Sequence, residues 1–117
     1  KYLSKRHKVK IIKCPTIRDK NKIALSTRNK LLNKKNYTKA SLFIKNLYKF
    51  KNNFIKNKNN FKNFSNTNIN KFEKKFQIKI DYLELRNEKN LSLSNFKGKN
   101  RLFVAYHLGN VRLIDNF

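Results

Sequence analysis

The residues best suited to chemistry in this 117-residue sequence stand in one short run, Ser26-Thr27-Arg28. An arginine guanidinium stays protonated at neutral pH, and its planar fork can grip two phosphate oxygens at once. The two neighbouring hydroxyl groups can donate hydrogen bonds to further oxygens. The run therefore indicates a phosphate-binding site, although an arginine in an irregular segment is ordinarily a solvated surface charge.

Other reactive residue types are few and carry no recognisable motif. Cys14 is the single cysteine, so it forms no internal disulfide and gives no hint of a metal cage. No histidine stands beside it, and we interpret it as a small packed residue. His7 is interpreted as an exposed residue and His107 as a strand-end residue. We predict no metal site in this chain.

A long loop is expected to position the Ser-Thr-Arg run, because residues 16–29 show neither helical nor strand periodicity. Before the loop, the β-branched residues around Ile11 predict a buried strand that ends at Pro15, since proline removes a ladder donor. After the loop, apolar residues recur at helical spacing from Tyr37 to Tyr48 and predict an amphipathic helix. Arg18, early in the loop, is a candidate either for binding or for holding the loop in place.

The middle of the chain predicts a weakly structured connection followed by a second helix. Residues 51–63 are rich in Lys and Asn, which is typical of a surface connection or a frayed helix end. Ile69, Phe72 and Phe76 then mark one helical face. This face needs a flat apolar surface on which to pack.

The last third of the sequence predicts the sheet that supplies this surface. Apolar residues alternate from Ile78 to Leu85 with one change of parity, which indicates a bulge. Two more strands are expected around residues 102–106 and 111–115, joined through Gly109 and Asn110. The fold class is therefore α+β, a two-layer small domain with helices packed on a three-stranded antiparallel sheet.

The charge of the chain supports two interpretations. A formal net charge of +24 is typical of proteins that bind RNA or DNA, such as ribosomal components. However, the charge comes mainly from Lys and accompanies Asn, Ile, Phe and Tyr, whose codons are rich in A and T. This composition favours drift in an AT-rich genome and makes nucleic-acid binding the less favoured interpretation.

The sequence also bears on where the chain resides. It contains no Met, and we expect it to be a fragment of a longer protein. No apolar run has the length of a membrane span, which needs about 18 residues, and no signal-peptide core is present. With a single cysteine, a reducing compartment is expected, so the location is predicted to be cytoplasmic.

Two separate stretches resemble the pantothenate synthetase family. Residues 14–19 and 23–29, Cys-Pro-Thr-Ile-Arg-Asp and Ile-Ala-Leu-Ser-Thr-Arg-Asn, resemble the segment in which a strand ends in a proline turn and a Ser-Ser-Arg-Asn loop follows. Residues 81–84 and 102–116 resemble the end of the same enzymes, including the final Arg-Leu-Ile-Asp-Asn. Only the Lys/Asn-rich middle departs from the family.

The resemblance implies an ATP-dependent ligase that joins pantoate to AMP and then lets β-alanine displace AMP, with Mg²⁺ on the phosphates. Residues 1–29 would be the end of a Rossmann-like nucleotide-binding domain with its last strand, and residues 30–117 a C-terminal lid. In the family the Ser-Ser-Arg loop plays the part of the KMSKS loop of related enzymes. Carried over by position, Ile17 would meet adenine through its backbone, and Leu25, Ser26, Thr27 and Arg28 would close over ATP, with Arg28 catalytic.

Departures from the family pattern set limits on this expectation. The family has Asp-Gly where this chain has Asn21-Lys22, and a lysine can strain a turn that needs positive φ. The family's second serine is Thr27, a conservative change. The family's His-containing nucleotide motif and its pantoate-binding groups are absent, so we expect this chain alone to be inactive. Its expected partners are the missing N-terminal domain, through which the family would form a homodimer, and the substrates pantoate and β-alanine.

Overall fold

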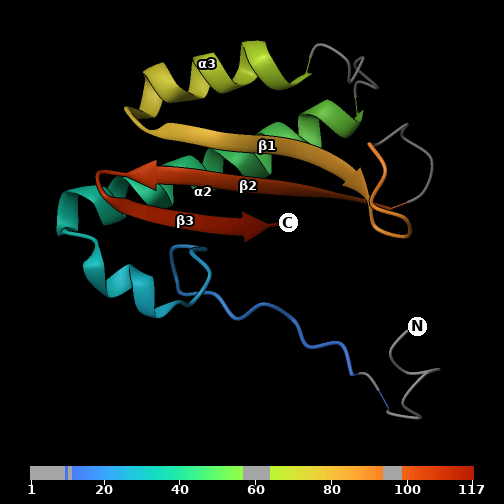
Figure 1. The fold of residues 1–117 in the computed structure, drawn as a ribbon, viewed down its shortest axis with the longest axis horizontal. Coiled ribbons are helices and arrows are strands. Elements are labelled where there is room, and N and C mark those ends of the chain that lie inside the picture. Colours follow the sequence, from blue (N-terminus) through green and yellow to red (C-terminus); the bar gives the residue numbers. More distant parts are fainter. Residues whose placement is uncertain (1–9, 11, 57–63, 94–98) are drawn as a thin grey trace.

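Residues 10, 12–56, 64–93 and 99–117 are described by the computed structural model of this chain. A short 3-10 helix and two α-helices precede three strands (Figure 1). These elements are η1 (Thr27–Leu31), α2 (Lys34–Lys56), α3 (Phe64–Phe76), β1 (Lys79–Asn87), β2 (Asn100–Leu108) and β3 (Val111–Asn116). None of the helices within the described ranges combines the length and the apolar character that a membrane span requires.

The three strands form an antiparallel sheet in the order β1-β2-β3. Its register shifts between Ile80 and Tyr82, which confirms the predicted bulge. The chain turns from β2 into β3 at Gly109, whose φ of +59° is a conformation that a side chain with a Cβ rarely adopts. This tight turn pairs Leu108 with Val111 and so fixes the register of β3, beside which the candidate site lies.

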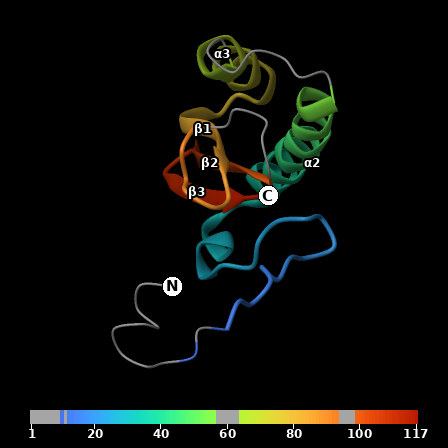
Figure 2. The same ribbon diagram turned by 90° about the vertical axis from the view of Figure 1, so that its right-hand side faces the viewer.

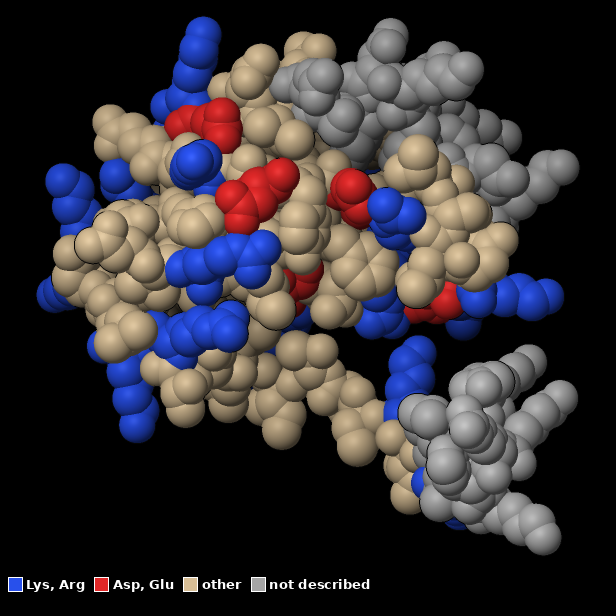
Figure 3. Space-filling model, viewed as in Figure 1, with Lys and Arg blue, Asp and Glu red and all other residues tan. Residues whose placement is uncertain are grey.

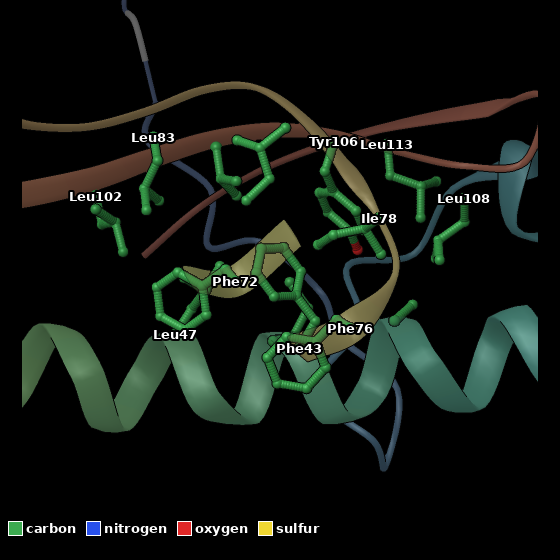
Figure 4. Packing of buried hydrophobic residues seen from close by; sticks show 14 of the residues in the cluster. Phe43, Leu47, Phe72, Phe76, Ile78, Leu83, Leu102, Tyr106, Leu108 and Leu113 are labelled. Carbon is green, nitrogen blue, oxygen red and sulfur yellow. The ribbon is translucent and has the colours of Figure 1, made fainter. Parts of the chain in front are cut away.

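Aromatic side chains from both helices fill the space against the sheet. Phe43 of α2 is fully buried, and its ring centroid lies 5.8 Å from that of Phe72, 5.5 Å from that of Phe76 and 4.8 Å from that of Tyr106. The tilted and edge-on geometries are those that aromatic pairs prefer. Figure 4 shows these rings between α2 and the strands, so the predicted helical faces do pack on the sheet.

The helices lie on one side of the sheet, which confirms the two-layer α+β fold. Figure 1 shows α2 behind the strands and α3 along β1, and Figure 2 shows α2 to the right of the strands with α3 above β1. Helix α2 is longer than predicted, because it continues through Lys56 and buries Phe54. The first part of the Lys/Asn-rich stretch is therefore helical, and residues 57–63 lie outside the described residues.

The strand predicted before Pro15 is not found in the described part of that segment. Lys10 and residues 12–17 carry no regular secondary structure, and the Ile12 side chain is 71% exposed. A strand is stabilised by hydrogen bonds to neighbouring strands, and the rest of a Rossmann-like domain is not in this chain. The other residues of the predicted strand, Val9 and Ile11, lie outside the described residues.

The interpretations of the cysteine and the histidines have different outcomes. Cys14 is exposed, so its interpretation as a small packed residue is wrong. It belongs to the same irregular segment, in which no neighbouring strand covers the side chains. His107 is the last residue but one of β2, which confirms its place at a strand end. His7 lies outside the described residues.

Candidate functional site

The predicted loop folds into a small hairpin beside the edge strand β3 (Figure 1). The Leu25 amide donates to the Ile17 carbonyl, and the Asp19 amide donates to the Ile23 carbonyl, each at 3.0 Å. The turn closes with a 3.0 Å hydrogen bond from the Lys22 amide to the Asp19 carbonyl. Lys22 adopts a φ of +71°, so a lysine occupies the left-handed position that usually selects glycine.

Replacement of Lys22 by glycine is therefore expected to stabilise the chain by about 1 kcal/mol, because the strain of a left-handed lysine disappears. Urea unfolding measures the change in the free energy of unfolding. Lys20→Gly is the matched control: the same substitution in the same turn, at a residue outside the left-handed region. Lys20→Gly is expected to lower the free energy of unfolding slightly. Equal effects of Lys20→Gly and Lys22→Gly would contradict the argument from strain.

The carboxylate of Asp19 organises the inside of this turn. Its Oδ1 accepts from the amides of Asn21 at 2.7 Å and Ile23 at 3.1 Å, and its Oδ2 accepts from the hydroxyl of Tyr37 on α2. Burial alone would raise the pKa of Asp19, but the hydrogen bonds from Tyr37 and the two amides outweigh it and lower that pKa. The Ile23 side chain is only 4% exposed, so the turn is also fastened to the core.

Removal of the Tyr37 hydroxyl is expected to cost about 1 kcal/mol of stability at neutral pH, since it deprives a charged acceptor of a donor. The lowered pKa of Asp19 means that its ionised form stabilises the fold above the ordinary value of 3.8. That contribution disappears as the pH falls through the lowered pKa. The difference between Tyr37→Phe and wild type, measured by urea unfolding across pH, should therefore shrink in acid. Tyr82→Phe serves as the control, and a pH-independent difference for Tyr37→Phe would argue against this network.

Arg18 ties the start of the loop to the end of the sheet. Its guanidinium makes a bidentate ion pair with Asp115 of β3, with Nη1–Oδ2 at 2.7 Å and Nη2–Oδ1 at 2.8 Å. Nη2 also donates to the Asn116 carbonyl at 2.8 Å, and the guanidinium carbon lies 4.9 Å from the Phe117 ring centroid. The hydrogen bond with Asp115, ahead of the opposing effect of burial, raises the pKa of Arg18. Of the two roles left open for Arg18, the structure shows the one of holding the loop.

An open hollow of about 340 Å³ lies between the loop and the sheet. Its walls are loop residues 23–29 on one side and Tyr106, Leu113, Ile114 and Asp115 on the other. Four of the predicted site residues, Leu25 to Arg28, thus border one space. Ile17 does not line it: the Ile17 side chain is 70% exposed, and its carbonyl is used in the hairpin.

The hydroxyl of Ser26 starts the short helix that presents the next residues. Ser26 Oγ accepts from the Arg28 amide at 3.3 Å as the N-cap of η1. Thr27 and Arg28 follow in the first turn of η1 and are exposed. Asn29 donates through Nδ2 to the Ala24 carbonyl at 3.0 Å, whereas its buried Oδ1 has no partner among the described residues. This wall of the hollow therefore presents the exposed Thr27 and Arg28.

Arg28 differs from the other arginines that the structure describes. Each of the others forms an ion pair with a carboxylate of this chain, and the pairs are Arg18–Asp115, Arg86–Glu84, Arg101–Glu88 and Arg112–Asp81. Within the described part of the chain the guanidinium of Arg28 has no such partner. Its guanidinium carries a permanent positive charge that is available to an anion from outside the chain.

The tether between Arg18 and Asp115 is the feature that sequence reasoning missed. A signal for it existed, because Val111, Leu113 and Asp115 share the inward parity of β3, and an inward carboxylate needs a partner. From sequence alone, Asp115 fits either a functional role or a closing turn. Its partner lies 97 residues away, so no local pattern could identify it.

Comparison with known proteins gives consistent matches. The family profile described as pantoate-beta-alanine ligase matches residues 3–117. The pantothenate synthetase of Chelativorans sp. (strain BNC1) is 33% identical over 107 residues, which cover 91% of this chain and 37% of that protein. The pantothenate synthetase of Flavobacterium psychrophilum is 31% identical over 110 residues, which cover 92% of this chain and 38% of that protein.

A solved structure agrees with this match. The pantoate-beta-alanine ligase from Francisella tularensis, complexed with beta-gamma ATP and beta-alanine, superimposes with a TM-score of 0.64 and 29% identity. The superposition covers 99% of this chain and 36% of that one. The family profile, the two sequence relatives and the solved structure thus agree on one family. The chain belongs to the pantoate-beta-alanine ligase family, and it spans less than two-fifths of the length of these three relatives.

Proposed function

We propose that this chain is the part of a pantothenate synthetase that closes over ATP. The whole enzyme joins the carboxylate of pantoate to AMP, releases pyrophosphate, and then lets the amine of β-alanine displace AMP to give pantothenate. Membership of the family and the names of the two relatives support the reaction. The ATP and β-alanine bound to the Francisella tularensis ligase support the choice of two of the substrates.

The unpaired guanidinium of Arg28, presented with Ser26 and Thr27 at the wall of the hollow, is the observation that carries the proposal. When the pantoate carboxylate attacks the α-phosphorus, negative charge moves onto the departing pyrophosphate. A fixed cation and hydroxyl donors at that position lower the barrier more than they stabilise bound ATP. Leu25 closes the apolar side of the nucleotide site, and the backbone of Ile17 meets the adenine.

The chain supplies the lid and leaves the remaining groups to the N-terminal domain. Residues 1–29 carry the loop at the end of the nucleotide-binding domain, and residues 30–117 form the lid to which Arg18, Asp19 and Ile23 fasten that loop. Dimerisation through the N-terminal domain and a cytoplasmic location complete the proposal. Among the described residues no group of three His, Cys, Asp or Glu side chains lies together where it could hold a metal ion. Mg²⁺ in this proposal is held by the phosphates of ATP.

A chimera tests the proposal, with this chain replacing the matching segment of the Francisella tularensis ligase. The chimera is expected to form AMP only when ATP, pantoate and β-alanine are all present, whereas the isolated chain is expected to form none. A chimera that folds but forms no AMP would contradict the proposal. The readout is AMP release measured by chromatography, with circular dichroism to verify folding.

The net charge of +24 supports RNA binding as the alternative function. On the face shown in Figure 3, Lys and Arg side chains are interspersed with acidic and uncharged residues. Filter binding over a salt series separates the two functions, because phosphate neutralisation gives a steep loss of affinity with salt. Tight, sequence-specific RNA binding with a steep slope would favour the alternative.

A further inference from the structure

A second hollow, of about 360 Å³, lies next to Arg28 and away from the loop hairpin. It is lined by Arg28 and Leu31 of η1, by Asn110 of the turn before β3, and by Val111 and Arg112 at the beginning of β3. Its volume falls within the range of about 300–1,000 Å³ typical of small-molecule sites. Arg28 is the residue that borders both this hollow and the one beside the loop.

Arg112 is held in one orientation while most of its guanidinium is left unused. Its Nε donates to Asp81 Oδ2 at 2.7 Å, and the same oxygen lies 3.1 Å from His107 Nε2. Among the described residues neither Nη1 nor Nη2 of Arg112 has a partner, and the side chain is 46% exposed. An arginine oriented through Nε keeps both terminal amino groups for a bidentate contact with phosphate.

The charge at this hollow favours an anion with several negative charges. Arg28 and Arg112 place two guanidinium groups on one space, and like charges brought together repel. The carboxylate of Asp81 is already engaged by Arg112 and His107, and Asp81 does not line this hollow. A polyanion between the two arginines removes the repulsion and gains a contact with each.

We propose that Arg112 is a second phosphate-binding arginine, and that the β- and γ-phosphates of ATP lie between Arg28 and Arg112. This inference rests on the proposed function and deepens it. A pantoate carboxylate oxygen forms a bond to the α-phosphorus, and the bond from that phosphorus to the oxygen bridging to the β-phosphorus breaks. The departing pyrophosphate keeps the electron pair, and both arginines hold the charge that it gains.

Binding of small phosphates to the 117-residue chain tests Arg112. Backbone amide NMR titrations with ATP, inorganic pyrophosphate and AMP, at constant ionic strength, give the affinities and locate the site. Arg112→Ala is expected to weaken binding of ATP and pyrophosphate roughly tenfold, because a charge-assisted contact is lost. AMP lacks the two outer phosphates, so its affinity should change by less than about twofold. Arg112→Lys should recover only part of the loss, since an ammonium cannot grip two oxygens at once.

The matched control is Arg86→Ala, which removes the same charge from β1 at a residue that lines neither hollow. It should leave all three affinities unchanged. Equal losses for Arg86→Ala and Arg112→Ala, or an equal loss of AMP and ATP binding, would overturn the role of Arg112.

Arg28→Ala separates the two proposals. If Arg28→Ala weakens ATP binding and Arg112→Ala does not, only this inference fails; if neither matters, or no saturable binding occurs, the proposed ATP loop fails with it.

Discussion

In the chimera of this chain with the Francisella tularensis ligase, Arg28→Ala is expected to slow AMP formation roughly 100- to 1,000-fold, the magnitude typical of the loss of one donor to a developing negative charge. The effect should fall on kcat more than on KM for ATP, since charge on the pyrophosphate grows as the bond breaks. The rate of Arg28→Lys should lie between that of Arg28→Ala and that of the parent chimera, because lysine keeps the charge and loses the planar fork. Initial rates over a range of ATP concentrations provide both parameters.

The matched control for this kinetic experiment is Arg101→Ala in the same chimera. Arg101 forms its ion pair with Glu88 and lines neither hollow, so its loss changes the net charge equally without touching the site. Its rate should stay within about twofold of the parent chimera. A parent-like rate for Arg28→Ala would remove the catalytic role assigned to the loop.

The largest loss of stability is expected from the replacement of Arg18. The Arg18 and Asp115 side chains are 15% and 6% exposed, so replacement of Arg18 by methionine leaves a buried carboxylate without its partner. We expect a loss of about 3 kcal/mol in the free energy of unfolding. Arg101→Met, which breaks a half-exposed pair, should cost less than about 1 kcal/mol. Urea unfolding at neutral pH measures both.

A double substitution separates the buried charge from general disruption of the loop. Arg18→Met combined with Asp115→Leu removes both charges and fills similar volume, so it should recover much of the loss of the single substitution. Equal stabilities for Arg18→Met and Arg101→Met would show that the tether contributes little. Amide hydrogen exchange in residues 19–25 gives a local readout, because these amides should lose protection first when the tether is broken.

The parts of the fold that depend on local periodicity could be predicted from the sequence. The face of Ile69, Phe72 and Phe76 predicted α3. The change of parity after Tyr82 predicted the bulge in β1, which the structure places between Ile80 and Tyr82. Helix α2 was underestimated, because a Lys/Asn-rich segment has little apolar signal even where Phe54 packs into the core. The strand predicted before Pro15 is not found in the described part of that segment. β-Branched residues favour a strand conformation, but a strand also needs a neighbouring strand with which to pair.

The candidate site likewise has a part that could be predicted from the sequence and a part that could not. The chemical character of Ser26, Thr27 and Arg28 was evident from residue type, and the structure brings them to one hollow. The supports of the loop were not evident, because Arg18 and Tyr37 find their partners through the folded chain. The pairing of the described arginines with carboxylates, which singles out Arg28, likewise exists only in three dimensions.

The three attachments of the hairpin bear on how access to the nucleotide is controlled. With Arg18 bonded to β3, Ile23 in the core and Asp19 bonded to α2, the hairpin cannot swing without its sheet. Residues 12–16 are all exposed and carry no regular secondary structure. In the proposed enzyme, opening of the nucleotide site would therefore carry the hairpin together with β3 and α2, and this irregular segment lies on the N-terminal side of the moving unit.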